Sequence, residues 1–350
     1  MSETDEVVCR REGAAGTILL NRPAALNALT LGMVRTMRPA LEAWANDPAV
    51  TRVVVMGAGE KAFCAGGDIR RLYELGRARS LAEALAFWRE EYELNILIQR
   101  FPKPYVSLID GIVMGGGVGV SLHGSHRIAG ERYLFAMPEV GIGFFPDVGA
   151  TYALPRLPGE TGTYIALTGD RIRAADAFAL GIATHAVRSD AILPLRDALI
   201  AGDDVDAALR ALAHDPGPAP IAENRAVIDS CFSAESVPGI LARLDEAAGR
   251  GSAFAERTAA TVRTKSPTSM SLALEQMRRG RDLSFEEAMK VEFRIVSRIA
   301  EGHDFYEGVR ATLIDRDGAP RWQPASLDAV DPADIARHFA DLGSRELQAP

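Results

Sequence analysis

Apolar and polar positions along the chain follow two alternating patterns. Short apolar runs rich in β-branched residues, closed by turn residues, predict strands in "GTILLNRP" and "RVVVMGAG". Between them, apolar residues recur at helical spacing and predict a helix over about Leu31–Asn46, with Thr30 as its N-cap. The apolar positions of this helix are Met33, Val34, Met37, Leu41 and Trp44.

Further strands are predicted in "PYVSLIDG", in "HRIAG" and at the start of "YLFAMPEV". Strands that alternate with helical patterns are typical of a layered α/β architecture. Beyond Gly169 the pattern is more helical, and Ser284 with Glu287 forms a capping-box pair before another helix. The loop His214–Pro220 marks a boundary. We therefore expect a core domain over residues 1–213 and a mainly helical C-terminal region over 214–350 that packs on it.

Composition narrows the class of protein. The 350 residues are 47% hydrophobic and 25% charged, which is ordinary for a globular protein, and the net charge of −8 argues against nucleic acid as a partner. The three cysteines are too far apart in the sequence for a zinc motif or a disulfide framework. A polar, acidic N-terminus and the lack of a long apolar run predict a cytoplasmic protein without a signal peptide or membrane span.

Two glycine-bearing loops each follow a predicted strand. "GIVMGGGVGV" offers backbone N–H groups at a helix start, either to hold an oxyanion or only to let the helix pack closely, and the run alone favours neither reading. "GEKAFCAGGDIR" offers further N–H groups at Ala65, Gly66 and Gly67. Together the loops predict two N–H donors that converge on one oxygen. The sequence has no Walker A motif, and "GVSLH" fails the nucleophile-elbow pattern.

Two acids stand in the otherwise apolar stretch "MPEVGIGFFPDVGATYALPRL". These are Glu139 and Asp147, and no basic residue occurs in this stretch before Arg156. Burial raises the pKa of a carboxylate and makes it a better base or nucleophile, and two neighbouring acids push their pKa values apart. Asp147 has a competing interpretation, because an Asp after Pro146 is a good N-cap for the helix that follows.

Four segments occur in the order and spacing of the crotonase (enoyl-CoA hydratase/isomerase) superfamily. They are "NRPAALNAL", "KAFCAGGDIR", "KPYVSLIDGIVMGGGVG" and "FAMPEVGIGFFPDVGATYALPRL". The chain resembles this superfamily over most of its length. "REEYELN", "GIATH", "SPTS" and "GHDFYEGVRATLIDRDGAPRW" resemble one branch of it, the 3-hydroxyisobutyryl-CoA hydrolases.

The resemblance implies a crotonase-like spiral of ββα units with a C-terminal helical region, and a substrate that is an acyl-CoA thioester. Coenzyme A is then part of the substrate, and neither a metal nor another cofactor is expected. The oxyanion hole would consist of the N–H groups of Ala65 and Gly116. The C-terminal helices would cover the site in this chain or in a neighbouring subunit, and the subunits would form trimers or hexamers.

Hydratases of the superfamily carry a Glu two residues after the triple glycine, where this chain has Gly119. This departure favours hydrolysis of a short hydroxyacyl-CoA thioester, as in valine breakdown, over hydration. Glu139 would attack the thioester carbonyl or activate water. Asp147 would orient the water, contact the substrate's 3-hydroxyl group or shuttle a proton. Glu91 would lie near the hydroxyacyl group, unless it belongs to a solvated helix face.

The remaining candidates have smaller roles. Gly66, Gly67 and Asp68 would belong to the loop that binds the substrate, with Asp68 supporting the loop by accepting backbone N–H bonds. Cys64 is expected to pack, and His123 and His126 are given no chemical role. Basic residues that would meet the CoA phosphates are Arg22 and Lys61, with surface solvation an equal alternative. Two other functions compete with the hydrolase: an enoyl-CoA hydratase or isomerase that uses Glu139, and an acyl-CoA-binding protein without activity.

Overall fold

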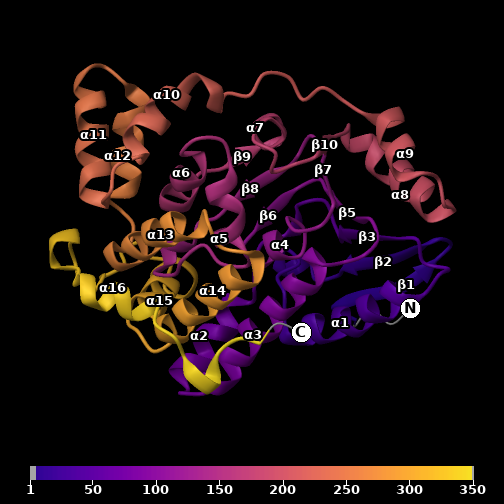
Figure 1. The fold of residues 1–350 in the computed structure, drawn as a ribbon, viewed down its shortest axis with the longest axis horizontal. Coiled ribbons are helices and arrows are strands. Elements are labelled where there is room, and N and C mark those ends of the chain that lie inside the picture. Colours follow the sequence, from indigo (N-terminus) through magenta and orange to yellow (C-terminus); the bar gives the residue numbers. More distant parts are fainter. Residues whose placement is uncertain (1–4, 349–350) are drawn as a thin grey trace.

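The computed structural model describes residues 5–348, and its centre is a spiral of strand–strand turns (Figure 1). In each turn the first strand joins a six-stranded sheet and the second joins a four-stranded sheet. The consecutive pairs β3–β4, β5–β6 and β7–β8 repeat this step three times. The arrangement confirms the predicted α/β class and the crotonase-like spiral.

The six-stranded sheet is parallel except at its first edge, where β1 is antiparallel to β2. In spatial order its strands are β1 (Val7–Glu12), β2 (Ala15–Leu20), β3 (Arg52–Gly57), β5 (Tyr105–Ile109), β7 (His126–Ala129) and β10 (His185–Ala186). The smaller sheet consists of β4 (Ala62–Cys64), β6 (Ile112–Met114), β8 (Leu134–Ala136) and β9 (Ile172–Arg173).

All five predicted strands are present, as β2, β3, β5, β7 and β8. Five further strands were not predicted, and two of them, β9 and β10, have only two residues each. β1 lies in the polar N-terminal segment, and β4 and β6 have three residues each, too few to show an alternating pattern.

Helices surround the two sheets. In the first part of the chain they are α1 (Leu31–Asn46), α2 (Ile69–Arg77), α3 (Leu81–Gln99), α4 (Gly116–Gly119), α5 (Ala150–Ala153), α6 (Thr161–Thr168), α7 (Ala174–Ala179), α8 (Ile192–Ala201) and α9 (Val205–Leu212). The predicted helix α1 is confirmed, and its cap is the Thr30 side chain, which accepts a hydrogen bond from the Met33 N–H.

The last part of the chain is helical. Its helices are α10 (Ile221–Phe232), α11 (Val237–Gly249), α12 (Ala253–Val262), α13 (Pro267–Gly280), α14 (Phe285–Ile299), α15 (Asp304–Val309) and α16 (Pro332–His338). The capping box predicted at Ser284 and Glu287 is present at the start of α14.

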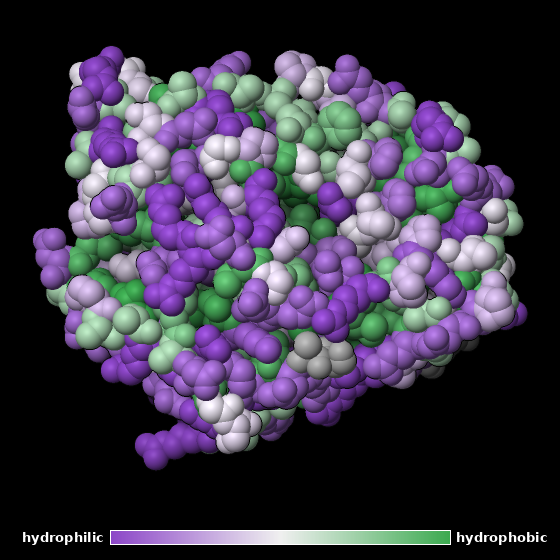
Figure 2. Space-filling view, in the orientation of Figure 1, coloured by the Kyte–Doolittle hydropathy of each residue, from purple (hydrophilic) through white to green (hydrophobic). Residues whose placement is uncertain are grey.

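The central strands β3 and β5 of the six-stranded sheet are buried on both faces. Along β3, Val53 and Val55 join the main core with α1 and α3, whereas Val54 faces a second core formed with α8 and α9. This alternation follows from the two-residue period of a strand. Figure 2 shows a mostly hydrophilic surface broken by smaller apolar patches. No helix within residues 5–348 is long and apolar enough to cross a membrane.

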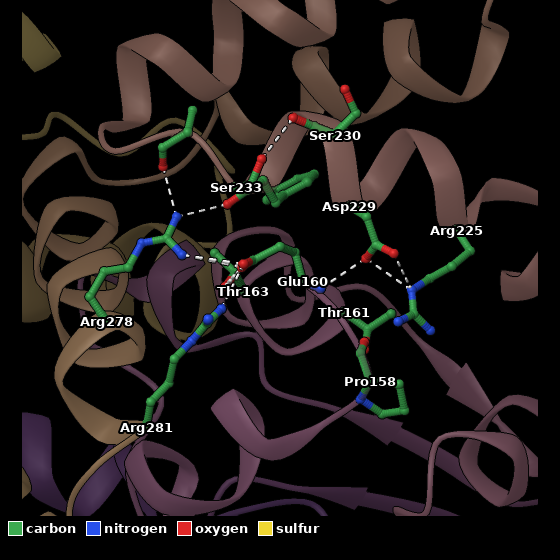
Figure 3. Close-up of polar contacts among 12 residues, drawn as sticks. Pro158, Glu160, Thr161, Thr163, Arg225, Asp229, Ser230, Ser233, Arg278 and Arg281 are labelled. Carbon is green, nitrogen blue, oxygen red and sulfur yellow. Dashed lines mark hydrogen bonds and ion pairs between the residues drawn. The ribbon is translucent and has the colours of Figure 1, made fainter.

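The C-terminal helices pack directly on the spiral: α14 contacts α3, and α13 contacts α6. A cluster around Glu160 joins these parts, because its carboxylate pairs with Arg278 on α13 and with Arg281 directly after this helix, and accepts a bond from Thr163 (Figure 3). Its backbone N–H donates to Asp229 on α10. The division into two regions at residue 213 stays a prediction.

Candidate active site

The two glycine-bearing turns lie against each other. Gly66 and Gly115 both have positive φ angles, of 126° and 46°, which favour glycine. A Cβ atom on Gly115 would lie 3.2 Å from the Gly66 Cα, and one on Gly116 would lie 3.3 Å from the Gly66 carbonyl carbon. The turn after β4 and the start of α4 therefore form one backbone surface.

The free amides of this surface differ from those expected. The N–H of Ala65 donates to the Leu26 carbonyl at 3.0 Å, so it has no hydrogen left for a substrate oxygen. This finding corrects the expectation for Ala65. The N–H groups of Gly66 and Gly67 donate to no acceptor within residues 5–348. The N–H of Gly116 belongs to the first turn of α4, where helix geometry leaves it without an intrahelical partner.

Glu139 lies beside this surface. It begins a 3₁₀ turn, Glu139–Ile142, shortly after β8, and its side chain is buried. Its Oε1 would be 3.4 Å from a Cβ on Gly115, and its Oε2 has no hydrogen-bond partner among the described residues. Burial raises the pKa of Glu139 well above its usual value, and the nearby charge of Asp147 raises it further.

Asp147 is also buried, and its carboxylate accepts a hydrogen bond of 2.8 Å from the Tyr92 hydroxyl on α3. Burial raises the pKa of Asp147 to about 7, and the bond from Tyr92 opposes that rise. The Asp147 side chain does not cap α5. The N-cap of this helix is Gly149, and only the backbone carbonyl of Asp147 accepts a hydrogen bond from it, from the Ala150 N–H. The capping interpretation is therefore wrong.

Glu91 is buried on α3, so the solvated-face interpretation is wrong for this acid. Its neighbours Glu90 and Glu93 form ion pairs with arginines on α1. A Cβ on Gly116 would lie 2.5 Å from the Glu91 Oε1, which has no partner among the described residues. Burial, followed by the charges of Asp147 and Glu292, raises the pKa of Glu91 well above its usual value.

A fourth acid, Glu292 on α14, was missed by the sequence reasoning. It is completely buried, and its two carboxylate oxygens accept the N–H groups of Gly149 at 2.8 Å and Thr151 at 2.9 Å. Burial and the charge of Asp147 raise the pKa of Glu292 to about 8. The signal in the sequence was an acid among the apolar positions of a helix, between Val291 and Phe293.

The place of the hydratase acid is filled by other side chains. A Cβ on Gly119 would lie 2.8 Å from the Asn95 amide nitrogen and 2.8 Å from the Val148 Cβ. A longer side chain at position 119 therefore has no room. The Asn95 amide is itself buried, and neither its nitrogen nor its oxygen has a hydrogen-bond partner in the described part of the chain.

A cavity of about 510 Å³ is lined by Asp68, the last residue of the loop before α2. Asp68 caps α2 by accepting the Arg71 N–H and pairs with Arg22 at 3.0 Å, which agrees with a supporting role. Arg22 and Arg70 line the cavity, whereas Lys61 is exposed and does not line it. Phe87 closes the inner side next to Gly67.

Other side chains near the site have structural surroundings. Burial raises the pKa of the Cys64 thiol to about 12, which agrees with a packing role. His126 stacks on His185, and its Nε2 lies 3.5 Å from an Asp206 carboxylate oxygen at the other end of the sheet. Within residues 5–348, no three His, Cys, Asp or Glu side chains are placed to hold a metal ion.

Comparison with known proteins adds to this geometry. The family model described as enoyl-CoA hydratase/isomerase matches residues 15–339. The chain belongs to the enoyl-CoA hydratase/isomerase family. Within the family, it is 46% identical over 359 residues to "3-hydroxyisobutyryl-CoA hydrolase, mitochondrial" of Rattus norvegicus, with 99% of this chain and 92% of the relative covered. The protein of the same name from Homo sapiens is 43% identical, with 98% and 91% covered.

Two solved structures of the family share the whole fold. A protein described as a carnitinyl-CoA dehydratase from Mycobacterium thermoresistibile is 45% identical, with a TM-score of 0.93 over 99% of each chain. One described as an enoyl-CoA hydratase from Rhodobacter sphaeroides is 39% identical, with a TM-score of 0.92 over 98% of this chain and 100% of that chain. The C-terminal helices are thus shared by these family members.

Proposed function

We propose that this enzyme hydrolyses a short hydroxyacyl-CoA thioester, with 3-hydroxyisobutyryl-CoA of valine breakdown as the preferred substrate. The observation that carries the proposal is the placement of Glu139. A buried carboxylate with one unpartnered oxygen lies beside two glycine turns that offer free N–H groups. The relatives named as 3-hydroxyisobutyryl-CoA hydrolases support the choice of acyl group.

The proposed oxyanion hole consists of the N–H groups of Gly67 and Gly116. The nitrogen of Gly67 is bonded to the Gly66 carbonyl carbon, which lies 3.3 Å from the position of a Cβ on Gly116. The two amides therefore lie on neighbouring backbone, next to the glycine turn that contacts Glu139. They stabilise the negative charge that develops on the thioester oxygen, and one such donor is worth about 2.7–4 kcal/mol in a transition state.

Glu139 attacks the thioester carbonyl directly or takes a proton from the attacking water. In the first route the carbon–sulfur bond breaks, the CoA thiolate takes a proton, and water then cleaves the mixed anhydride. In the second route the hydroxide formed by this proton transfer adds to the carbonyl, the carbon–sulfur bond breaks, and the CoA thiolate takes up the proton that Glu139 removed from the water. Both routes end in a hydroxy acid and a free thiol. Hydroxylamine distinguishes them, because it traps an anhydride as a hydroxamate on Glu139 that mass spectrometry of the peptide detects.

The other acids have separate proposed roles. Asp147 orients the water or passes a proton to the leaving thiolate, and its pKa of about 7 suits proton exchange near neutral pH. Glu91 binds the substrate's 3-hydroxyl group, because its unpartnered Oε1 lies next to Gly116. Arg22 and Arg70 contact the CoA part of the substrate from the cavity that they line.

A hydratase activity is the second candidate, because two solved family members are described as a dehydratase and a hydratase. Gly119 argues against it, since the space that an acid would need there is filled by Asn95 and Val148. Incubation with a panel of acyl-CoA thioesters decides between them. A hydrolase releases thiol from 3-hydroxyisobutyryl-CoA, whereas a hydratase changes enoyl absorbance and releases no thiol. If the protein binds acyl-CoA but gives neither signal, it is an acyl-CoA-binding protein without activity.

Location and assembly stay predictions. The relatives are named as mitochondrial, whereas a cytoplasmic location is proposed for this chain. Trimers or hexamers are expected from the family resemblance, and light scattering of the purified protein measures the assembly directly.

A further inference from the structure

The loop that carries Asp147 has an unfavourable backbone conformation. Val148, the next residue, has a φ angle of +52° and a buried side chain. A β-branched residue in this left-handed region is a true outlier and costs on the order of 1–3 kcal/mol. Such a conformation persists only where surrounding groups hold it. The direction of the Asp147 carboxylate therefore depends on contacts from outside the loop.

Three side chains from distant parts of the chain hold this loop. His123 donates from Nε2 to the Val148 carbonyl at 2.6 Å. Gln276 on α13 donates to the Pro146 carbonyl and to the Thr151 hydroxyl. Glu292 on α14 accepts the N–H groups of Gly149 and Thr151.

Glu292 differs from the other two because it is an acid with two acceptor oxygens, which carries a charge when it ionises. Each of its oxygens accepts one N–H group, and this arrangement suits the ionised carboxylate. A neutral amide could not satisfy both groups, because Gln has one carbonyl oxygen and an NH2 group that only donates. The carboxyl group therefore holds both amides at once, at the electrostatic cost of a fourth acid next to Asp147.

We propose that Glu292 is a positioning residue for Asp147: its carboxylate clamps the Gly149 and Thr151 amides and so holds Asp147 towards Glu139 and the thioester. The inference rests on the proposed thioester hydrolysis. It also gives the C-terminal region a direct part in the reaction, since α14 supplies the clamp from 143 residues further along the chain.

Electrostatics supports the same interpretation. The titratable groups around Glu292 are Asp147 from the loop, Glu139 from the turn after β8, and Glu91 and Tyr92 from α3. The charge of Glu292 is among the causes that raise the pKa values of Glu91, Tyr92 and Glu139. Removing it would therefore lower the pKa of the acids in the site as well as loosen the loop.

The test compares the wild type with Glu292→Gln and with Glu286→Gln as the matched control. Glu286 lies on the same helix but pairs with Arg100 near the surface. Thiol release from 3-hydroxyisobutyryl-CoA gives kcat and KM across pH, and thermal melting reports folding. For Glu292→Gln we expect kcat to fall about 10²-fold, as for a misplaced catalytic group, with KM changed less than threefold. The midpoint of the acidic limb in the plot of kcat against pH should move to lower pH. Glu286→Gln should match the wild type.

Each other outcome has a defined meaning. An unchanged kcat in Glu292→Gln would overturn the inference. A fall in kcat that is accompanied by a lower melting temperature and leaves the pH midpoint of kcat unmoved would overturn it as well. If Glu292→Gln does not fold, Glu292→Asp replaces it, because Asp keeps the charge but is too short to reach both amides. Full activity of Glu292→Asp would then overturn the clamp. A wild type that releases no thiol would instead contradict the proposed function.

Discussion

The Tyr92 hydroxyl donates a hydrogen bond of 2.8 Å to the Asp147 carboxylate, across 55 positions of sequence. Both groups are buried, and no basic side chain forms a hydrogen bond or ion pair with Asp147 among the described residues. The phenol thus stabilises the Asp147 carboxylate without bringing a positive charge next to it. This contact ties the longest helix of the spiral, α3, to the loop after Pro146.

Tyr92→Phe tests that contact through pH. The bond stabilises the ionised form of Asp147 and so lowers its pKa, which is about 7 with the bond in place. Loss of the hydroxyl should therefore raise the pKa, and the kinetic midpoint that belongs to Asp147 should move to higher pH. Rates of thiol release between pH 5 and 9 measure it. An unmoved midpoint would show that Asp147 does not titrate in the rate-limiting step.

Glu139→Gln should remove turnover but not binding. The amide has nearly the same size, so the buried pocket stays filled, yet it is neither a base nor a nucleophile. We expect kcat to fall about 10²–10⁴-fold, the usual contribution of such a group. Calorimetry with free coenzyme A should give the same affinity as the wild type. Substantial thiol release by this variant would remove Glu139 from the mechanism.

Gly116→Ala tests the backbone surface. The added Cβ would lie 2.5 Å from the Glu91 Oε1, so the acid must shift and the neighbouring amide becomes crowded. We expect kcat/KM to fall about 10²–10³-fold, as for the loss of one oxyanion donor. Gly249→Ala is the matched control, because a Cβ there meets nothing within 4 Å. Equal activity of both variants would contradict a role for the Gly116 amide.

Gly119→Glu asks whether the missing hydratase acid can be restored. The Cβ alone would lie 2.8 Å from the Asn95 amide nitrogen and from the Val148 Cβ, so the larger side chain overpacks the core. We expect a loss of about 1–3 kcal/mol in the free energy of unfolding, without any hydration of an enoyl-CoA. A stable variant that hydrates crotonyl-CoA would refute the steric argument.

Glu160→Gln should lower stability without changing the chemistry. Its buried carboxylate pairs with Arg278 at 3.3 Å and Arg281 at 2.6 Å, and the cluster lies between α6, α10 and α13 (Figure 3). The loss of charge should cost about 1–3 kcal/mol in denaturant unfolding, since charge-assisted bonds are replaced by neutral ones. The pH profile of thiol release should be unchanged. A shifted profile would link this cluster to the site.

Sequence reasoning worked where local features decide structure. The helix α1 was predicted at both ends because its apolar residues keep a helical period and Thr30 supplies the cap. Glu139 was a candidate because an acid in an apolar, glycine-rich stretch is unusual at the level of sequence. The spiral fold followed from the resemblance, since its motifs keep their order and spacing along the chain.

The tertiary structure decided which groups meet and which are already occupied. Ala65 and Gly67 look equivalent in "CAGGD", but the Leu26 carbonyl takes the Ala65 N–H. The sequence allows Asp147 to cap the helix that follows it. In the structure the Gly149 and Thr151 N–H groups at the start of this helix donate instead to Glu292, from a helix far along the chain. Residue type and spacing thus determine the chemistry that this chain has available. Long-range contacts decide which of these groups remain free for chemistry. A donor that is already hydrogen-bonded to a distant residue is not available to a substrate, and no local sequence pattern shows that it is bonded.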